Sequence, residues 1–179
     1  MLFYTSDLHF GHKNVMLFDH RPFADVEEMD AFIIKVWNSR VQPEDMVYIL
    51  GDFCHKSEKT PDWYLKRLKG HKTLIIGNHD GKLLKNQRAM SYFDKVENML
   101  EIDDGKNHLC LCHYPIAEWN GYFQQSWHVY GHIHNKKAET YELMKTKERA
   151  LNAGCMINNY APASLNELIR NNRIFRGDD

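Results

Sequence analysis

The stretch "KTLIIGNHD", residues 72–80, shows the pattern on which the fold of this chain is built. A short continuous apolar run is typical of a buried strand, and here it ends abruptly in glycine, asparagine, histidine and aspartate. The same arrangement occurs earlier in the chain at "MVYILGD", residues 46–52. Buried strands that end in glycine and polar side chains are typical of α/β proteins, in which ligands bind beyond the carboxyl ends of the strands.

Apolar spacing and capping signals predict the remaining elements. We expect strands over residues 2–6, 46–50, 72–76, 96–102, 108–112, 127–130, 140–144 and 149–153. We expect helices over residues 25–40, from Thr60 to Gly70, over 82–88 and from Ser164 onward. Strands and helices alternate in the first half, which indicates parallel pairing, whereas the Asp104-Gly105 turn predicts an antiparallel hairpin in the second half. The sequence therefore predicts a single α/β domain over residues 1–179.

The composition is that of an ordinary globular protein, with 43% hydrophobic and 26% charged residues. Lys and Arg number 23 against 24 Asp and Glu, so the formal net charge is −1 and the chain lacks the basic excess of a dedicated nucleic-acid binder. We see neither a signal peptide nor a membrane span, and the four cysteines have no CxxC spacing. We therefore expect a reduced, cytoplasmic protein. Histidine is unusually frequent, with 11 residues.

Residues that could bind a metal follow the buried strands. They are Asp7, His9, Asp52, Asn78, His113, His132 and His134. Residues two apart in an extended chain point to the same side, so Asp7 can act beside His9, and His132 beside His134. The donors are nitrogen and oxygen only, which suits Zn, Fe, Ni, Mn or Mg. Seven ligands favour two ions that share a carboxylate, and the excess positive charge favours an anionic substrate such as phosphate.

In chain order, the blocks "DLH", "GD", "GNHD", "CH" and "GHIH" resemble the signature of the calcineurin-like metallophosphoesterase superfamily. They span residues 7–134, and "SDLHFGHKN" followed by "RPF" resembles a small bacterial and phage group within it. The resemblance implies an α/β fold, a four-layer αββα sandwich with two mixed β-sheets, and a metal site at the carboxyl ends of the strands. It also implies a chain without a cap domain.

The resemblance further assigns roles to residues of this chain. It implies a first metal held by Asp7, His9, Asp52 and His134, and a second held by Asp52, Asn78, His113 and His132. His79 would be the catalytic histidine, and Asp80 would orient it. The cofactors expected are two divalent ions, Mn first, with Fe, Zn, Ni or Co as alternatives. The implied reaction is hydrolysis of a phosphodiester, or else a phosphomonoester, by a metal-bridging hydroxide. The substrate expected is a small phosphorylated molecule, with a nucleotide-like one among the alternatives.

Other residues have alternative interpretations. His12 and Arg21 follow the first block in a loop, and we expect them to bind substrate or to support the ligands. The aromatic loop 114–127 is either a wall for base stacking, a subunit contact or a cover over the core. The remaining histidines are expected to be surface or satisfied core residues: His20, His55, His71, His108 and His128.

Two other functions remain open on the sequence. A nuclease is the alternative within the enzyme class, and the neutral charge balance weakens it. A non-catalytic scaffold for protein interactions on the same fold is the alternative outside that class. A scaffold would be expected to lose catalytic groups, whereas His79 and all seven candidate ligands are present.

Overall fold

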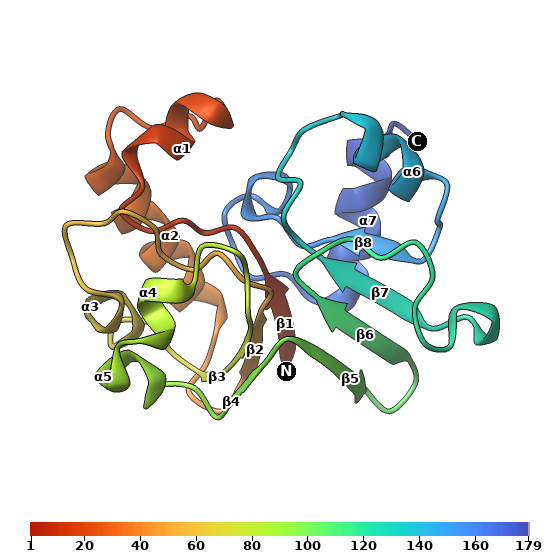
Figure 1. The fold of residues 1–179 in the computed structure, drawn as a ribbon, viewed down its shortest axis with the longest axis horizontal. Coiled ribbons are helices and arrows are strands. Elements are labelled where there is room, and N and C mark those ends of the chain that lie inside the picture. The colour runs from red at the N-terminus through yellow and green to blue at the C-terminus, as the bar shows by residue number, and fades with distance from the viewer. Residues whose placement is uncertain (179) are drawn as a thin grey trace.

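The computed structural model describes residues 1–178 as a mixed α/β structure with two four-stranded sheets (Figure 1). The first sheet has the order β1-β2-β3-β4, and its neighbouring strands all pair in parallel. Its strands are β1 (Leu2–Thr5), β2 (Met46–Ile49), β3 (His71–Ile75) and β4 (Lys95–Glu97). The parallel sheet expected from the first half of the sequence is therefore confirmed, whereas the expectation of two mixed sheets is wrong for this sheet.

The second sheet has the order β5-β6-β7-β8. Its strands are β5 (Met99–Asp103), β6 (His108–Cys112), β7 (Trp127–Tyr130) and β8 (Ala150–Asn152). β5 and β6 form the expected antiparallel hairpin, with Glu101 opposite Cys110, but β6, β7 and β8 pair in parallel. The expected strand over 96–102 is two strands, because the chain bends at Asn98 and passes from the first sheet to the second.

The helices lie between and after the strands. They are α1 (Lys13–Phe18), α2 (Val26–Arg40), α3 (Pro61–Leu65), α4 (Gly81–Leu84), α5 (Gln87–Met90), α6 (Glu139–Lys145) and α7 (Leu165–Arg176), with 3-10 turns η1 (Tyr122–Gln124) and η2 (Cys155–Asn158). Both capping signals are confirmed: Asp25 accepts a bond from the backbone N–H of Glu28, and Ser164 forms a capping box with Glu167. α3 ends earlier than expected, at Leu65.

The strand expected over 140–144 is wrong, because this segment is helix α6. Apolar and polar residues alternate at Tyr141, Glu142 and Leu143, which suggested a strand. In the structure, however, the buried side chains are Tyr141 and Met144, while Leu143 is 49% exposed. Burial three residues apart is the helical period, so packing onto the second sheet selected the helix.

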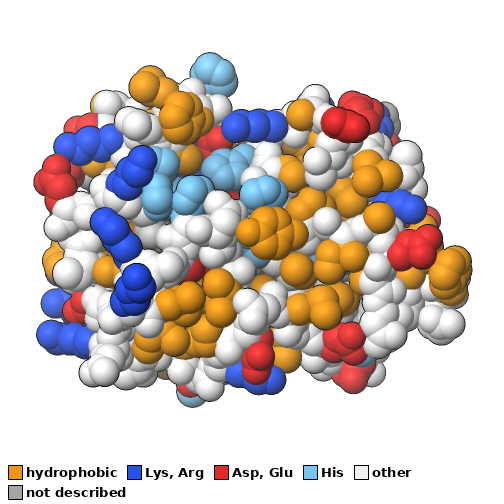
Figure 2. Space-filling view, in the orientation of Figure 1, with side chains coloured by type: hydrophobic (Ala, Val, Ile, Leu, Met, Phe, Trp, Pro, Cys, Tyr) orange, Lys and Arg blue, Asp and Glu red, His pale blue; other side chains and the backbone are white. Residues whose placement is uncertain are grey.

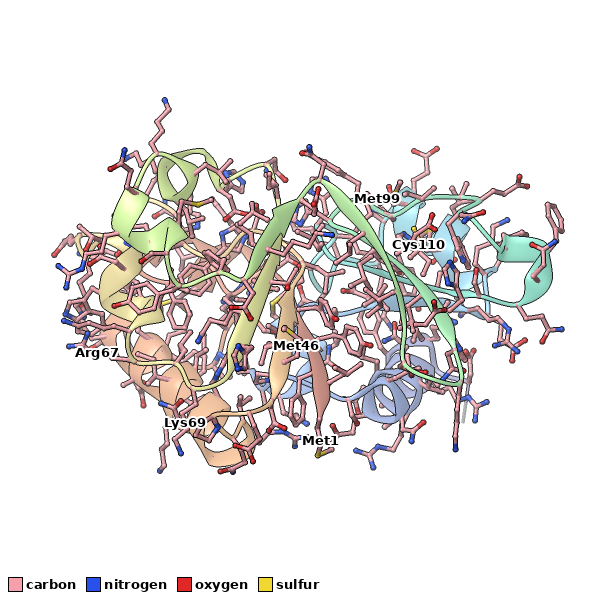
Figure 3. The ribbon with its side chains drawn as sticks, turned by 90° about the horizontal axis from the view of Figure 1, so that it is seen from below. Met1, Met46, Arg67, Lys69, Met99 and Cys110 are labelled. Atoms are coloured by element: carbon pink, nitrogen blue, oxygen red, sulfur yellow. The ribbon has the colours of Figure 1, made fainter. Side chains whose placement is uncertain are left out.

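Buried apolar side chains form clusters on the two faces of each sheet. On β1, Phe3 belongs to the cluster that contains α2, whereas its neighbour Tyr4 belongs to the cluster between the sheets. On β6, Leu109 also lies between the sheets, while Cys110 belongs to a third cluster with Met144 of α6. Strand alternation thus places apolar side chains on both faces of both sheets, whose side chains Figure 3 shows from below. Parallel pairing brings the carboxyl ends of β1, β2 and β3 to one edge of the first sheet, and those of β6 and β7 to one edge of the second. Within residues 1–178, no helix is long and apolar enough to cross a membrane.

Candidate metal centre

The seven candidate ligands come together from the carboxyl ends of five strands, namely β1, β2, β3, β6 and β7. Figure 2 shows histidine side chains gathered in a hollow beneath α1, with lysine or arginine side chains around it. A cleft at this position is lined by five of the seven candidates, namely His9, Asp52, Asn78, His132 and His134. Asp7 and His113 lie beneath that wall and are fully buried.

The first group consists of Asp7, His9, Asp52 and His134, whose ligand atoms all lie within 4.8 Å of one another. The Nε2 atom of His9 lies 3.2 Å from Nε2 of His134 and 3.5 Å from Oδ2 of Asp52. Nε2 of His134 lies 3.6 Å from Oδ1 of Asp7. The first three residues are buried, and burial holds the pKa of His9 far below its usual value, so its imidazole is neutral and able to bind a metal.

The second group consists of Asn78, His113 and His132, and it adjoins the first at Asp52. Oδ1 of Asn78 lies 3.0 Å from Nε2 of His113 and 3.0 Å from Nδ1 of His132. Nε2 of His113 also lies 3.7 Å from Oδ2 of Asp52. Asp52 therefore stands between the two groups, with Oδ2 near His9 on one side and near His113 on the other.

The backbone at the candidate ligands differs from the expected extended chain. Positive φ angles occur at five of the seven, namely Asp7 (55°), His9 (50°), Asp52 (54°), His132 (71°) and His134 (54°). The prediction that strand alternation places Asp7 beside His9 is therefore wrong in its mechanism, because turns in the left-handed region bring these side chains together. Such conformations cost free energy in non-glycine residues and concentrate at functional sites.

Glycines allow the strand ends to approach one another closely. A Cβ atom on Gly51 would lie 2.5 Å from Nδ1 of His113, and one on Gly131 would lie 1.8 Å from Oγ of Ser6. Gly51 also has a φ of +82°, which disfavours any side chain. Gly51 and Gly131 therefore permit the close backbone approach that places Asp52 and His132.

Asp19 and Arg21 support the first group from behind. Nδ1 of His134 donates to both carboxylate oxygens of Asp19, at 2.7 and 2.8 Å. Arg21 donates to Asp19 through Nε and Nη2, and to the backbone carbonyls of Leu8 and Asp7. The sequence analysis did not identify Asp19, although a carboxylate that fixes a ligand histidine is a common support of metal sites.

The Arg21 side chain has no exposed surface, so the prediction that it contacts substrate is wrong. Its guanidinium group donates to the backbone carbonyls of Asp7 and Leu8 and to the carboxylate of Asp19. The alternative prediction for Arg21, support of the ligands, agrees with this geometry. The cause is α1, which turns the chain back so that Arg21 lies beneath the first block.

Asp80 does not orient His79. Its Oδ2 accepts backbone N–H groups from Asp52 and Gly77, and its Oδ1 accepts the N–H of Phe53. The carboxylate is buried, and burial raises its pKa to about 6. The predicted role of Asp80 is therefore corrected: it holds together the loops that carry Asp52 and Asn78.

His79 lies in the cleft beside two other histidines. Its ring centroid is 4.2 Å from that of His55 and 5.5 Å from that of His9, and His12 lies 4.8 Å from His55. His79, His55 and His12 all line the cleft. His55 was expected to be a surface or core histidine, and the structure places it on the cleft wall, because only two residues separate it from Asp52.

Three other histidines, His71, His108 and His128, lie where they were expected, at the surface or in the core. His128 is buried, donates through Nδ1 to the carbonyl of Cys110 and accepts at Nε2 from the N–H of Ile116. His71 and His108 form surface pairs with acidic residues. In the aromatic loop, Trp119 is buried and donates to Ser126, so this part of the loop covers the core.

The site geometry can be tested against a bound cation. Nδ1 of His113 donates to the carbonyl of Leu50 at 2.7 Å, so Nε2 of the neutral ring carries a lone pair. That lone pair faces Oδ1 of Asn78 and Oδ2 of Asp52, both acceptors. Likewise, Nδ1 of His134 donates to Asp19, and Nε2 faces His9 and Asp7. With the proton of each neutral ring on Nδ1, the Nε2 electron pairs of His113 and His134 converge with carboxylate and amide oxygens, a donor set that fits a metal ion.

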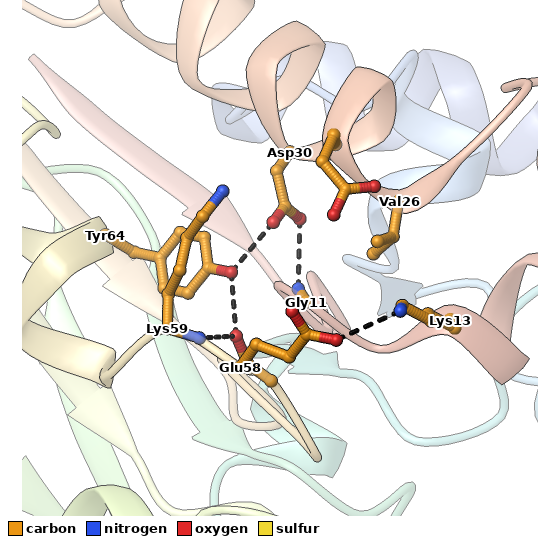
Figure 4. Close-up of a pocket in the computed structure, with 9 residues that line it drawn as sticks. Gly11, Lys13, Val26, Asp30, Glu58, Lys59 and Tyr64 are labelled. Carbon is orange, nitrogen blue, oxygen red and sulfur yellow. Dashed lines mark hydrogen bonds and ion pairs between the residues drawn. The ribbon is translucent and has the colours of Figure 1, made fainter.

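A second pocket, shown in Figure 4, has no such arrangement. Asp30 is its buried acid, and its two oxygens accept from the N–H of Gly11 and the hydroxyl of Tyr64. Nζ of Lys13 pairs with Glu58 at its rim. The donors and acceptors there satisfy one another. Their hydrogen bonds connect the loop after β1 to α2 and α3.

The sequence and fold were compared with known proteins. No family model matches the chain. The uncharacterized protein MJ1445 of Methanocaldococcus jannaschii is 31% identical over 172 residues, which cover 94% of this chain and 89% of that protein. This chain belongs to the MJ1445 family. The Gene 66 protein of Mycobacterium phage L5 is 46% identical over 91 residues, which cover 48% of this chain and 42% of that protein.

A solved structure extends the family fold to a bacterium. The protein of unknown function AQ665 from Aquifex aeolicus is 26% identical and superposes with a TM-score of 0.74, covering 95% of this chain and 98% of that chain. More remote matches with phosphoesterases and a nuclease have TM-scores of 0.38 to 0.49 and identities of 17 to 19%, too low to establish a shared activity. Both similarities extend over nearly the whole chain, and neither of the two proteins is named with an activity.

Proposed function

We propose that this protein is a dinuclear metal-dependent phosphoesterase that acts on phosphodiesters. The observation that carries the proposal is the convergence of lone pairs from two adjoining groups of nitrogen and oxygen donors on Asp52. Their backbone supports this view, because five of the seven residues adopt the left-handed conformation. Two cations beside three carboxylate and amide side chains leave net positive charge, which suits a phosphate ester.

The residues present fit two divalent ions, for which we propose Mn²⁺. Asp7, His9, Asp52 and His134 would hold one ion. Asn78, His113 and His132 would hold the other, with Asp52 shared. When bound, such an ion pair supplies Lewis-acid activation of water and of the phosphoryl oxygens. The fold proposed for this centre is the four-layer αββα sandwich, and the apolar clusters on both faces of both sheets support it.

Residues of the cleft wall complete the proposed site. His79 reaches the cleft from the loop after β3. Its backbone N–H donates to Oδ1 of Asp52 at 2.8 Å, and this bond fixes the loop against the shared ligand. The imidazole of His79 would give a proton to the leaving oxygen. His12 lines the same cleft and would donate a hydrogen bond to a substrate oxygen.

The proposal is tested by metal content and turnover together. Purified protein is assayed for bound metal and for Mn²⁺-dependent hydrolysis of bis(p-nitrophenyl) phosphate and p-nitrophenyl phosphate. We expect Asp52→Asn to lose both metal and turnover. We expect His79→Gln to retain metal and to lose about 10²- to 10⁴-fold in kcat, the usual contribution of an acid–base group.

His71→Gln is the matched control, because His71 is an exposed histidine at the opposite end of β3. It should keep both metal and activity. Absence of metal binding and of turnover in the wild type would overturn the proposal and favour the interaction scaffold. Faster turnover of the monoester than of the diester would correct the substrate class.

A further inference from the structure

The candidate metal centre occupies only part of its cleft. The lining continues from the ligands onto α1, with Asn14, Val15 and Phe18, and onto Lys56 and Lys136. In the proposed function, the phosphate group binds at the candidate ligands, which form only one part of this lining. The remaining wall is therefore available to the groups that the phosphate joins.

Phe18 offers an apolar ring on this wall. Phe18 is 61% exposed, and its ring centroid lies 6.5 Å from that of His12 in an edge-on arrangement. A single exposed phenylalanine is unremarkable on an open surface. Here the ring stands in a cleft lined mainly by histidine, asparagine, lysine and acidic side chains, where Val15 is the other apolar residue of the lining and the ring pair with His12 is edge-on.

The position of Phe18 is fixed relative to the metal centre. The next residue is Asp19, which accepts from Nδ1 of His134, and the N–H of Asp19 donates to the carbonyl of Val15 at 3.0 Å. Val15 is buried in the core of the first sheet. The backbone at Phe18 is therefore anchored next to Asp19, the residue that fixes the candidate ligand His134.

The charges of the cleft point to an anionic partner with more than the reacting phosphate. Lys56 and Lys136 are exposed and line the same cleft. Figure 2 shows basic side chains beside the hollow that holds the histidines, with hydrophobic side chains above it. One ring is too small an apolar surface for an acyl chain, whereas it matches the face of a nucleobase.

Resting on the proposed function, we propose that the substrate is a nucleoside phosphoester whose base stacks on Phe18. The phosphate would lie at the candidate metal centre, and Lys56 and Lys136 would face any further phosphates. Base–aromatic stacking tolerates every base, so Phe18 would select nucleotides as a class and not one sequence.

Two ligands that differ only by the base test this proposal. Dissociation constants of AMP and of ribose 5-phosphate are measured by calorimetry with saturating Mn²⁺. We expect AMP to bind the wild type about tenfold more tightly, or better, since stacking contributes on this scale. Phe18→Ala should remove the preference and leave ribose 5-phosphate binding unchanged, whereas Phe18→Trp should retain it.

Phe123→Ala is the matched control, because Phe123 is 79% exposed and lies outside this cleft. It should bind both ligands as the wild type does. Equal affinity of the wild type for AMP and ribose 5-phosphate would overturn the proposal, as would a Phe18→Ala variant that weakens both ligands alike. Failure of the proposed function is seen separately. Diester turnover without a preference for AMP overturns only the nucleotide proposal. A preference for AMP without turnover overturns only the proposed phosphoesterase activity.

Discussion

The two halves of the candidate metal centre are built differently. In the first half, Asp7 and His9 are buried, and the carboxylate of Asp19 fixes His134. In the second half, Asn78 and His132 are exposed, and only His113 is buried. His113 is fixed by a backbone carbonyl, that of Leu50, and not by a charged side chain.

This difference predicts unequal affinities for metal. A buried carboxylate without a cation is costly, and burial raises the pKa of Asp7, so an ion in the first half relieves a larger penalty. The carboxylate of Asp19 also increases the basicity of His134. We therefore infer that the first half fills with metal before the second.

The largest expected effect separates the halves by removing one ligand from each. The wild type should bind two Mn²⁺ ions in two steps, which a calorimetric titration measures. His9→Ala should remove the tighter step, and kcat/KM should fall about 10³-fold, equivalent to roughly 4 kcal/mol. His132→Ala should keep the tighter step and lose the weaker one. The reverse pattern would contradict the inferred order of filling.

The next effect concerns the charged support of the first half. Asp19→Asn should weaken the tighter Mn²⁺ step by about 10- to 100-fold, the usual range for a carboxylate behind a ligand histidine, and leave the weaker step unchanged. Asp94→Asn is the control, since Asp94 pairs with the exposed His71 and with no candidate ligand. Equal weakening of both steps would show that Asp19 supports the whole centre.

The sequence predicted the ligand set but not its support. Asp52 and His132 follow glycine at the ends of apolar runs, a local pattern that can be read directly from the chain. Asp19 meets His134 across more than a hundred residues, and no local pattern shows this contact. Asp80 was misassigned for the same reason, because its neighbour in sequence is His79 but its partners are backbone amides of two loops.

The fold shows the same limit. Capping residues placed α2 and α7, since Asp25 and Ser164 act within one turn of the helix they begin. Residues 140–144 became a helix because Tyr141 packs against Phe175 of α7 and Met144 packs onto the second sheet, a tertiary effect that overrides alternation. Asn98 divides the expected strand because the chain changes sheets there, and local propensity carries no information on that change.

A smaller effect is expected at Asp80, which serves the shared ligand and the second half. Asparagine has one acceptor oxygen, so Asp80→Asn would leave an N–H of Asp52, Phe53 or Gly77 facing an amide NH₂ group. We expect the free energy of unfolding to fall by about 1–3 kcal/mol. Urea unfolding in EDTA measures this without metal, and the exposed Asp103 provides the control Asp103→Asn. Unchanged stability would show that the loops hold their shape without this carboxylate.

The smallest effect is expected where the two halves share a backbone carbonyl. The carbonyl of Leu50 accepts both from Oγ of Ser6, at 2.7 Å, and from Nδ1 of His113, also at 2.7 Å. Ser6→Ala removes the first bond and should lower the free energy of unfolding by about 0.5–1.5 kcal/mol. His113 keeps its own bond, so both Mn²⁺ steps should persist. Ser91→Ala, which removes an exposed bond to the carbonyl of Arg88, should have almost no effect. Loss of the weaker Mn²⁺ step in Ser6→Ala would instead mean that Ser6 fixes the carbonyl for His113, and that the second half depends on the first.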